Sequence, residues 1–151
     1  MREKVYVDTS SLIILNKINV LDLLNKIYSN VYITKYINAE WNENLPSWII
    51  IEPAYNFEQS FLKNFNLGPG ESSIIMNALK NDGFLIIDDL KARKIATTLS
   101  LRFTGSVGVL ITAKRLGFIH SVKYYLEKIQ ETNFRLSDAL IIKALEITNE
   151  K

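Results

Sequence analysis

Short apolar runs alternate with amphipathic stretches along this chain, and the alternation predicts strands that are each followed by a helix. Runs rich in β-branched and aromatic residues predict strands at Lys4 to Asp8, Asn30 to Thr34, Phe84 to Ile87 and Leu101 to Thr104. A further apolar run extends from Trp48 to Glu52 and is closed by a proline. Strands this short, separated by helices, are typical of a mainly parallel sheet.

Between these runs, apolar residues recur at helical spacing. In the stretch Tyr55 to Phe65 we expect a helix whose aromatic residues, Tyr55, Phe61 and Phe65, face inward. The predicted helices are Leu12 to Lys17, Val20 to Tyr28, Tyr36 to Asn42, Tyr55 to Phe65, Glu71 to Asn81, Leu90 to Leu99, a helix that starts around Gly105 to Gly108 and reaches Leu116, Ser121 to Glu131, and Leu136 to Thr148. The pattern therefore predicts an α/β fold, with a central sheet and helices on both faces, in one domain over residues 1–151.

Composition narrows the chemistry that this chain can perform. It has no cysteine, which excludes thiolate metal sites and a cysteine nucleophile. It has one histidine, His120, which argues against a Ser-His-Asp catalytic triad. The 18 Lys and Arg residues nearly balance the 16 Asp and Glu residues, so charge permits a nucleic-acid partner without requiring one. No apolar run is long enough to span a membrane, and no signal peptide is recognisable, so we expect a cytoplasmic protein without a membrane partner.

Acidic residues fall where a parallel sheet would place a ligand. Asp8 ends the first predicted strand, and Asp88 and Asp89 follow the apolar run Phe84 to Ile87. Ligands of open α/β sheets bind outside the carboxyl ends of the strands. Glu71 follows Gly68-Pro69-Gly70, and Glu40 lies on the helix after the second strand.

Each of these acids also has an ordinary structural interpretation. Asp8 and one of the Asp88-Asp89 pair would serve as helix N-caps, Glu71 would complement a helix dipole, and Glu40 would be a solvated helical residue. Their joint arrangement favours a site, because two carboxylates roughly 5 Å apart repel by about 3 kcal/mol at an effective dielectric constant near 20. A bound cation or protonation must relieve that repulsion.

Several segments, taken in order, resemble PIN domains, the metal-dependent ribonucleases that include the VapC toxins of toxin–antitoxin pairs. The resemblance covers nearly the whole chain, and part of it is to a PIN-related branch of predicted nucleic-acid-binding proteins. The segments that carry it are Val5 to Ser11, Val31 to Thr34 with Ile37 to Glu40, Leu67 to Ile75, Phe84 to Asp89 with Ala92-Arg93, Thr104 to Leu110 with Ala113-Lys114, and Phe134 to Asp138.

The resemblance implies a PIN-like three-layer sandwich and a metal-dependent endoribonuclease that leaves 5′-phosphate and 3′-hydroxyl products. It implies that Asp8, Glu40, Glu71 and either Asp88 or Asp89 bind Mg²⁺ or Mn²⁺ and carry the catalysis. Oxygen-only ligation suits these hard cations. Where a typical PIN domain has Thr-x-Asp, this chain has isoleucines before the acidic pair, so the choice between Asp88 and Asp89 stays open.

RNA is the partner that the resemblance implies, together with a small antitoxin protein and a homodimer. Ser10 is placed to hydrogen-bond Asp8 or a phosphate, although capping the first helix is an equally good role for it. Arg93 lies one helical turn after Asp89 and would pair with that acid or with a phosphate. We expect some of the following basic residues to flank the cleft that holds the acids: Lys91, Arg93, Lys94, Lys114 and Arg115.

Three other functions compete with the nuclease. The first is a PIN-fold module that binds nucleic acid or protein and has lost catalysis. The second is a nucleotide-binding protein, but neither phosphate-loop motif is present, and Pro69 stands where such a loop needs a backbone donor. The third is a phosphoacceptor receiver domain, in which the acidic pair would follow the first strand and not a later one.

Overall fold

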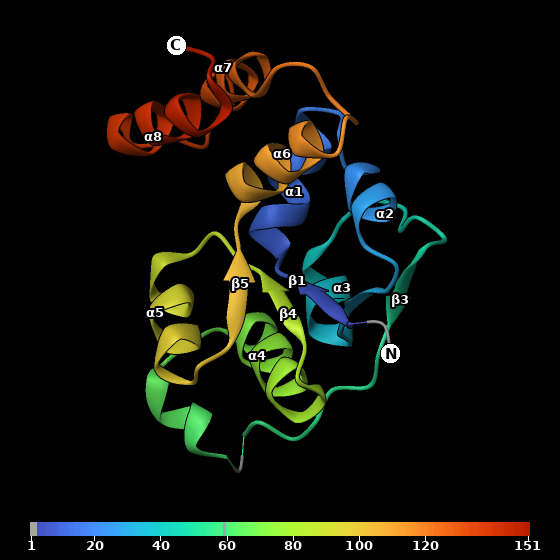
Figure 1. Ribbon diagram of the computed structural model, residues 1–151. Helices are drawn as coiled ribbons and strands as arrows, with labels where there is room; N and C mark the ends of the chain where they lie inside the picture. Colours follow the sequence, from blue (N-terminus) through green and yellow to red (C-terminus); the bar gives the residue numbers. More distant parts are fainter. Residues whose placement is uncertain (1–2, 59) are drawn as a thin grey trace.

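Five parallel strands form a single sheet in the computed structural model, which describes residues 3–58 and 60–151. The strand order is β3-β2-β1-β4-β5 (Figure 1). The strands are β1 (Val5–Val7), β2 (Val31–Ile33), β3 (Ile49–Ile51), β4 (Phe84–Ile86) and β5 (Arg102–Thr104). The α/β fold and the parallel sheet expected from the sequence are confirmed.

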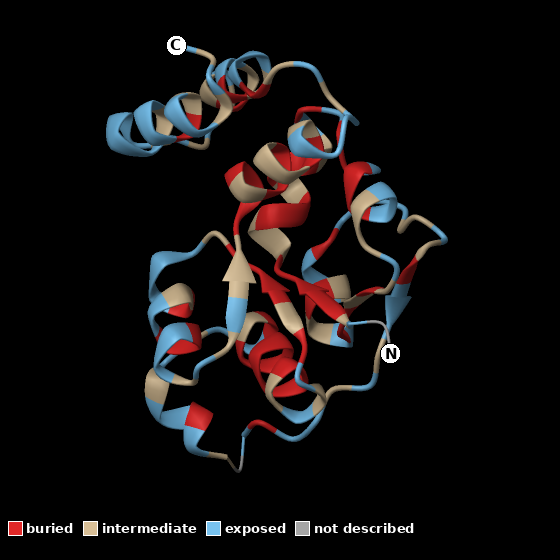
Figure 2. Ribbon diagram, in the orientation of Figure 1, coloured by how far each residue is buried: buried red, intermediate tan, exposed pale blue. Residues whose placement is uncertain are grey.

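The strand order creates a switch point beside β1. From β1 the chain continues to β2 and β3 on one side of the sheet, and then to β4 and β5 on the other side. Val7 is in register with Ile86, so β1 and β4 end side by side. All three residues of β1 are buried, as the colouring of Figure 2 shows for the centre of the sheet. Ligands of such sheets bind at this position, outside the carboxyl ends of the two strands.

Helices are packed around the sheet. Helix α4 contacts β1 and β4, α5 contacts β5, and α1 and α2 contact α6. Helices α7 and α8 pack on α6 and on each other, at the top of Figure 1. In the described residues the helices are α1 (Thr9–Lys17), α2 (Leu23–Ile27), α3 (Lys35–Glu40), α4 (Pro69–Asn81), α5 (Leu90–Thr98), α6 (Ser106–Arg115), α7 (Val122–Gln130), α8 (Asp138–Thr148) and the 3₁₀ helix η1 (Phe61–Phe65).

The prediction of one helix from Tyr55 to Phe65 is wrong. Only η1 is helical, and Gln59 lies outside the described residues. Tyr55 and Phe61 are about half exposed instead of facing inward, whereas the buried apolar residues of this stretch are Phe57 and Leu62. At the start of this segment, the Tyr55 backbone N–H donates a hydrogen bond to the side chain of Asn77 at 3.0 Å. This bond takes the place of a helical hydrogen bond.

The last residues of the chain fasten α8 to α6 and α7. The Glu150 carboxylate accepts hydrogen bonds from Lys114 Nζ at 2.8 Å, from the Ser121 hydroxyl at 2.8 Å and from the Val122 backbone N–H at 2.8 Å. Burial opposes the charge of Glu150, but these donors and the Lys123 N–H outweigh it and lower the pKa of the carboxyl to about 2. Lys114 is thus committed to Glu150, and the expectation that it flanks a cleft of acids is wrong.

A polar cluster on Glu52 joins β1, α4 and the segment after β3. The Glu52 carboxylate accepts from the Tyr6 hydroxyl at 2.6 Å, from Lys4 Nζ at 2.7 Å and from Asn77 Nδ2 at 2.9 Å. Asn81 Nδ2 donates to the Tyr6 hydroxyl at 2.9 Å. Because Tyr6 is fully buried, its hydroxyl needs these partners to offset the cost of losing water.

Among the described residues, no helix has both the length and the apolar character that crossing a bilayer requires.

Replacement of Tyr6 by Phe tests the Glu52 cluster. The change removes a hydroxyl that donates to a carboxylate, so we expect the free energy of unfolding to fall by about 1.5–3 kcal/mol. Urea titration followed by circular dichroism measures the loss. Tyr32→Phe is the matched control, because Tyr32 lies beside Tyr6 on β2 and its hydroxyl forms no hydrogen bond within residues 3–58 and 60–151. Equal effects of the two variants would contradict this role for the cluster.

Candidate functional site

Acidic side chains from four separate segments line one pocket at the carboxyl end of the sheet. Asp8 follows β1, Glu40 ends α3, Glu71 lies in the first turn of α4, and Asp89 precedes α5. We call this space, of about 220 Å³, the carboxylate pocket. Its full lining is Asp8, Thr9, Ser10, Glu40, Gly68, Gly70, Glu71 and Asp89. The structure therefore brings together four of the five acids that the sequence singled out.

Asp8 is the most rigidly held of these acids. One carboxylate oxygen accepts the Ser11 backbone N–H at 2.7 Å, which caps α1, and the other accepts the Asp88 backbone N–H at 3.3 Å. The residue is 2% exposed. Burial raises the pKa of Asp8 to about 6, against the opposing effect of its hydrogen bonds with Ser11, and the charge of Asp88 raises it further. Asp8 is thus both a helix cap and a member of the pocket.

The structure separates the roles of Asp88 and Asp89. The Asp88 carboxylate accepts hydrogen bonds from the Ser11 hydroxyl at 2.5 Å and from the Ser106 hydroxyl at 2.6 Å, and also from the Ser106 N–H. It is not part of the pocket lining. Asp89 is exposed, lines the pocket, and uses one oxygen to cap α5 through the Ala92 N–H at 2.9 Å. Asp89 is therefore the better placed of the two for a ligand.

Gly70 makes room for the carboxylate of Glu40. A Cβ atom at position 70 would overlap the Glu40 carboxylate and would lie 2.9 Å from the Cδ1 atom of Ile37. The exposed Glu40 side chain thus reaches the pocket only because the α4 backbone carries no side chain there. The sequence shows Gly70 directly before Glu71, but nothing in the sequence could show that Gly70 faces Glu40.

Glu71 experiences the negative charge of the whole pocket. Burial raises the pKa of Glu71 to about 7, and the charges of Asp89, Asp8 and Glu40 raise it as well. All three of those acids share the pocket lining with Glu71. The pocket therefore holds more carboxylates than it can keep ionised without a compensating positive charge.

The pocket also contains an unsatisfied hydroxyl. The Thr9 side-chain oxygen is buried and has no hydrogen-bond partner among the described residues, although Thr9 lines the pocket beside Asp8. A buried hydroxyl without a partner carries a cost of about 1–3 kcal/mol. A ligand or ordered water in the pocket would remove that cost.

The cations of which some were expected to flank the cleft do not line the pocket. None of Lys91, Arg93, Lys94, Lys114 and Arg115 is part of the pocket lining. Lys91 donates to the backbone carbonyl of Asn66 at 2.8 Å. The Arg93 guanidinium lies 5.1 Å from the centre of the Phe103 ring, and within the described residues it forms no ion pair with Asp89. A contact between Arg93 and substrate stays a prediction, whereas Ser10 does line the pocket.

The donors in this pocket fit a hard divalent cation. Carboxylate and hydroxyl oxygens are the ligands that Mg²⁺ and Mn²⁺ prefer. In the part of the chain that the structure describes, no three Asp, Glu or His side chains are already gathered tightly enough to form a finished metal site. The fit thus lies in the chemistry and charge of the lining, and the exposed side chains of Glu40 and Asp89 would have to move inward.

A family model described as a PIN domain, DUF3368, matches residues 4–150. The chain therefore belongs to this PIN-domain family, and its fold is that of a family of nuclease type. No curated protein and no solved structure shows a significant match to it.

Two serines that bind a candidate acid, Asp88, were not singled out from the sequence. Ser11 and Ser106 both bind Asp88, and they come from α1 and from the first turn of α6. Both fall inside motifs that the sequence analysis quoted for the resemblance. Their shared contact could not be seen there, because it joins residues 95 positions apart along the chain.

Replacement of Glu71 by Gln tests the charge crowding. In metal-free buffer the raised pKa of Glu71 contributes stability below its ordinary value of 4.5, and this contribution is lost as pH rises through about 7. We therefore expect the variant to melt at a higher temperature than the wild type near pH 8, with the difference disappearing below about pH 4.5. Thermal unfolding across that pH range measures the effect.

Glu127→Gln serves as the control for this experiment, because Glu127 is an exposed carboxylate on α7, away from the pocket. It should melt like the wild type at every pH. A Glu71→Gln variant whose difference from the wild type does not change with pH would show that the pocket is not crowded with charge.

Replacement of Gly70 by Ala tests the route by which Glu40 enters the pocket. The added methyl group would push the Glu40 carboxylate away, so we expect a higher Mn²⁺ concentration to be needed for half-maximal thermal stabilisation, by about 10-fold or more. Gly68→Ala is the control, because a Cβ there meets only the Glu71 Oε1 atom at an ordinary 3.6 Å. Indistinguishable Mn²⁺ responses of the two variants would rule out the proposed role of Gly70.

Proposed function

We propose that this protein is a Mg²⁺- or Mn²⁺-dependent endoribonuclease that hydrolyses phosphodiester bonds of RNA at the carboxylate pocket. The observation that carries the proposal is the convergence of four carboxylates, from four segments of the chain, at the switch point of a parallel sheet. Membership of a PIN-domain family supports it, since that family is typically one of metal-dependent nucleases.

The four acids would share the work of holding the cation. Two backbone N–H groups fix the position of the Asp8 carboxylate. Asp8 would therefore be the stationary ligand, and the side chains of the other acids would move to complete the site. Glu40, Glu71 and Asp89 would complete the oxygen donors. Asp88 would act through its neighbours, because it holds Ser11 and Ser106 and thereby fixes the ends of α1 and α6 next to Asp8.

When bound, a divalent cation lowers the pKa of a coordinated water and neutralises charge on the phosphate. The residues of the chain would position the attacking water and the phosphate. Carboxylate oxygens of the pocket would orient the attacking water by accepting its hydrogen bonds. The hydroxyl groups of Thr9 and Ser10 would donate hydrogen bonds to a phosphate oxygen, and for Thr9 this would supply the partner that its buried oxygen lacks.

A toxin role, a small antitoxin partner and a homodimer stay predictions of the family resemblance. The same is true of the 5′-phosphate and 3′-hydroxyl products. The catalytically silent binding module remains the second candidate function, and the experiment below distinguishes it from the nuclease.

Replacement of Asp8 by Asn tests the proposed activity. The change keeps the size of the side chain and, through the amide oxygen, the cap on α1. It removes the charge that would bind the cation and the acceptor for the Asp88 backbone N–H. We expect cleavage of a panel of single-stranded RNAs to fall by more than about 100-fold, while the protein stays folded. Gel analysis of RNA incubated with Mg²⁺ or Mn²⁺, and in parallel with EDTA, measures cleavage.

Asp138→Asn is the matched control, because Asp138 is an exposed acid in the first turn of α8 and does not line the pocket. It should cleave like the wild type. Cleavage that survives in Asp8→Asn, or that continues in EDTA, would contradict the proposal. RNA binding without cleavage of any RNA by the wild type would instead identify the silent module.

A further inference from the structure

Three neighbouring pockets follow the exposed face of α1. The carboxylate pocket shares Glu40 with a second space of about 170 Å³, which we call the Trp41 pocket. The Trp41 pocket shares Lys17 with a third space of about 500 Å³, which we call the tyrosine pocket. The Trp41 pocket is lined by Ile13, Asn16, Lys17, Glu40, Trp41, Asn42 and Glu43. The tyrosine pocket is lined by Lys17, Ile18, Asn19, Tyr124, Tyr125, Lys128, Glu131 and Thr132.

One stripe of α1 connects the three spaces. Ser10, Ile13 and Lys17 are spaced three and four residues apart, so they lie on the same face of the helix. Ser10 lines the carboxylate pocket, Ile13 lines the Trp41 pocket, and Lys17 lines both the Trp41 and the tyrosine pockets. The stripe spans about 10.5 Å along the helix axis, at 1.5 Å per residue. An extended polymer could follow it from one pocket to the next.

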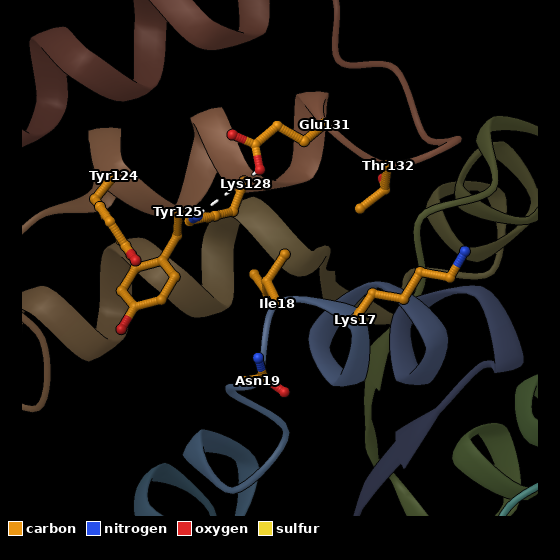
Figure 3. A pocket seen from close by; sticks show the side chains of 8 residues that line it. All are labelled: Lys17, Ile18, Asn19, Tyr124, Tyr125, Lys128, Glu131 and Thr132. Carbon is orange, nitrogen blue, oxygen red and sulfur yellow. Dashed lines mark ion pairs between the residues drawn. The ribbon is translucent and has the colours of Figure 1, made fainter.

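The tyrosine pocket combines aromatic rings with positive charge. The rings of Tyr124 and Tyr125 meet edge to face at 5.0 Å, and Tyr124 is 52% exposed. Lys128 Nζ lies 5.4 Å from the centre of the Tyr124 ring. Figure 3 shows the two tyrosines on one side of the space, Lys17 on the other and Ile18 between them. This combination suits a chain of bases and phosphates, because bases stack on aromatic rings and phosphates bind lysine.

Negative charge in the tyrosine pocket is limited to one residue among those that line it. Glu131 forms an ion pair with Lys128 at 3.8 Å, with both side chains more than a third exposed, so the pair contributes little and is easily exchanged for another partner. Lys17 and Lys128 leave the lining with a net charge of +1. The charge of the path thus changes sign along α1, from the acids beside Ser10 to the lysines beside Tyr124.

The Trp41 pocket between the two ends offers apolar surface and amide groups. Trp41 is buried, and its indole N–H has no hydrogen-bond partner among the described residues. Asn16 Nδ2 donates to Glu43 at 2.6 Å, which leaves the side-chain carbonyl of Asn16 to accept a further bond. Glu40 and Glu43 would repel a phosphate here, so this part of the path suits a base and not the backbone.

We propose that single-stranded RNA lies along α1, with a phosphate in the carboxylate pocket and, beyond the Trp41 pocket, bases on Tyr124 and Tyr125 and backbone beside Lys17 and Lys128. The proposal rests on the proposed function for the identity of the polymer. It adds α7, which contributes nothing to the carboxylate pocket, to the substrate-binding surface. A single strand is specified because stacking on the exposed Tyr124 and the half-buried Tyr125 requires bases that are not paired.

Binding of labelled RNA by fluorescence anisotropy, in metal-free buffer, tests the proposal without any contribution from cleavage. The full-length protein is titrated with a single strand of about ten nucleotides and with an RNA duplex of the same length, whose paired bases cannot stack on the tyrosines. Tyr124→Ala should weaken binding of the single strand by about 5- to 100-fold and leave binding of the duplex unchanged, whereas Tyr124→Phe should bind like the wild type.

Lys128→Ala supplies a second readout. Loss of one phosphate contact should reduce the slope of log affinity against log salt concentration by about 0.7 for a single strand. Lys123→Ala is the matched control, because Lys123 is an exposed lysine on the same helix that does not line the tyrosine pocket. Its slope and affinity should equal those of the wild type.

The outcomes separate this inference from the nuclease itself. Unchanged binding of the single strand by both Tyr124→Ala and Lys128→Ala would overturn the proposed RNA path along α1, even if the wild type cleaves RNA and Asp8→Asn does not. Equal weakening of the duplex and the single strand by Tyr124→Ala would overturn it too. If the wild type cleaves nothing but its binding of the single strand depends on Tyr124 and Lys128, the result supports the RNA path and contradicts the nuclease.

Discussion

Mutual repulsion among four carboxylates is the physical constraint that dominates the carboxylate pocket. The parallel sheet ends β1 and β4 side by side, and that fixes Asp8 next to the start of α5, while α3 and α4 bring Glu40 and Glu71 to the same pocket. The cost appears in Asp8 and Glu71, where burial first, and the charges of neighbouring carboxylates in addition, raise the pKa values to about 6 and about 7. A folded protein keeps such an arrangement at the expense of stability, which is common at functional sites.

Structural and functional roles coincide at the strand ends. Asp8 caps α1 and Asp89 caps α5, so the ordinary interpretation of each acid was correct and did not exclude a place in the pocket. A capping carboxylate uses only part of its capacity to accept hydrogen bonds, and the remaining lone pairs stay available to a cation. Asp88 differs, because two serine hydroxyls and a backbone N–H occupy its oxygens.

The sequence predicted the strands and the acids at their ends, because short buried runs and strand-end carboxylates are local features. It could not choose between Asp88 and Asp89, since the choice depends on Ser106, which reaches Asp88 from α6. It also placed lysines beside the pocket by proximity in sequence, whereas Lys114 binds Glu150 at the other end of the chain. The aromatics of the stretch from Tyr55 predict a helix, but Tyr55 and Phe61 are about half exposed and the Tyr55 N–H donates to the side chain of Asn77.

Diffraction from a crystal soaked in Mn²⁺ tests the central claim most directly. Anomalous scattering locates the ion independently of any activity. The account predicts a peak among the oxygens of Asp8, Glu40, Glu71 and Asp89, with Asp88 still bound to its two serines. A peak coordinated by Asp88 in place of Asp89, or a pocket that stays free of Mn²⁺ while all four carboxylates keep their positions, would contradict it.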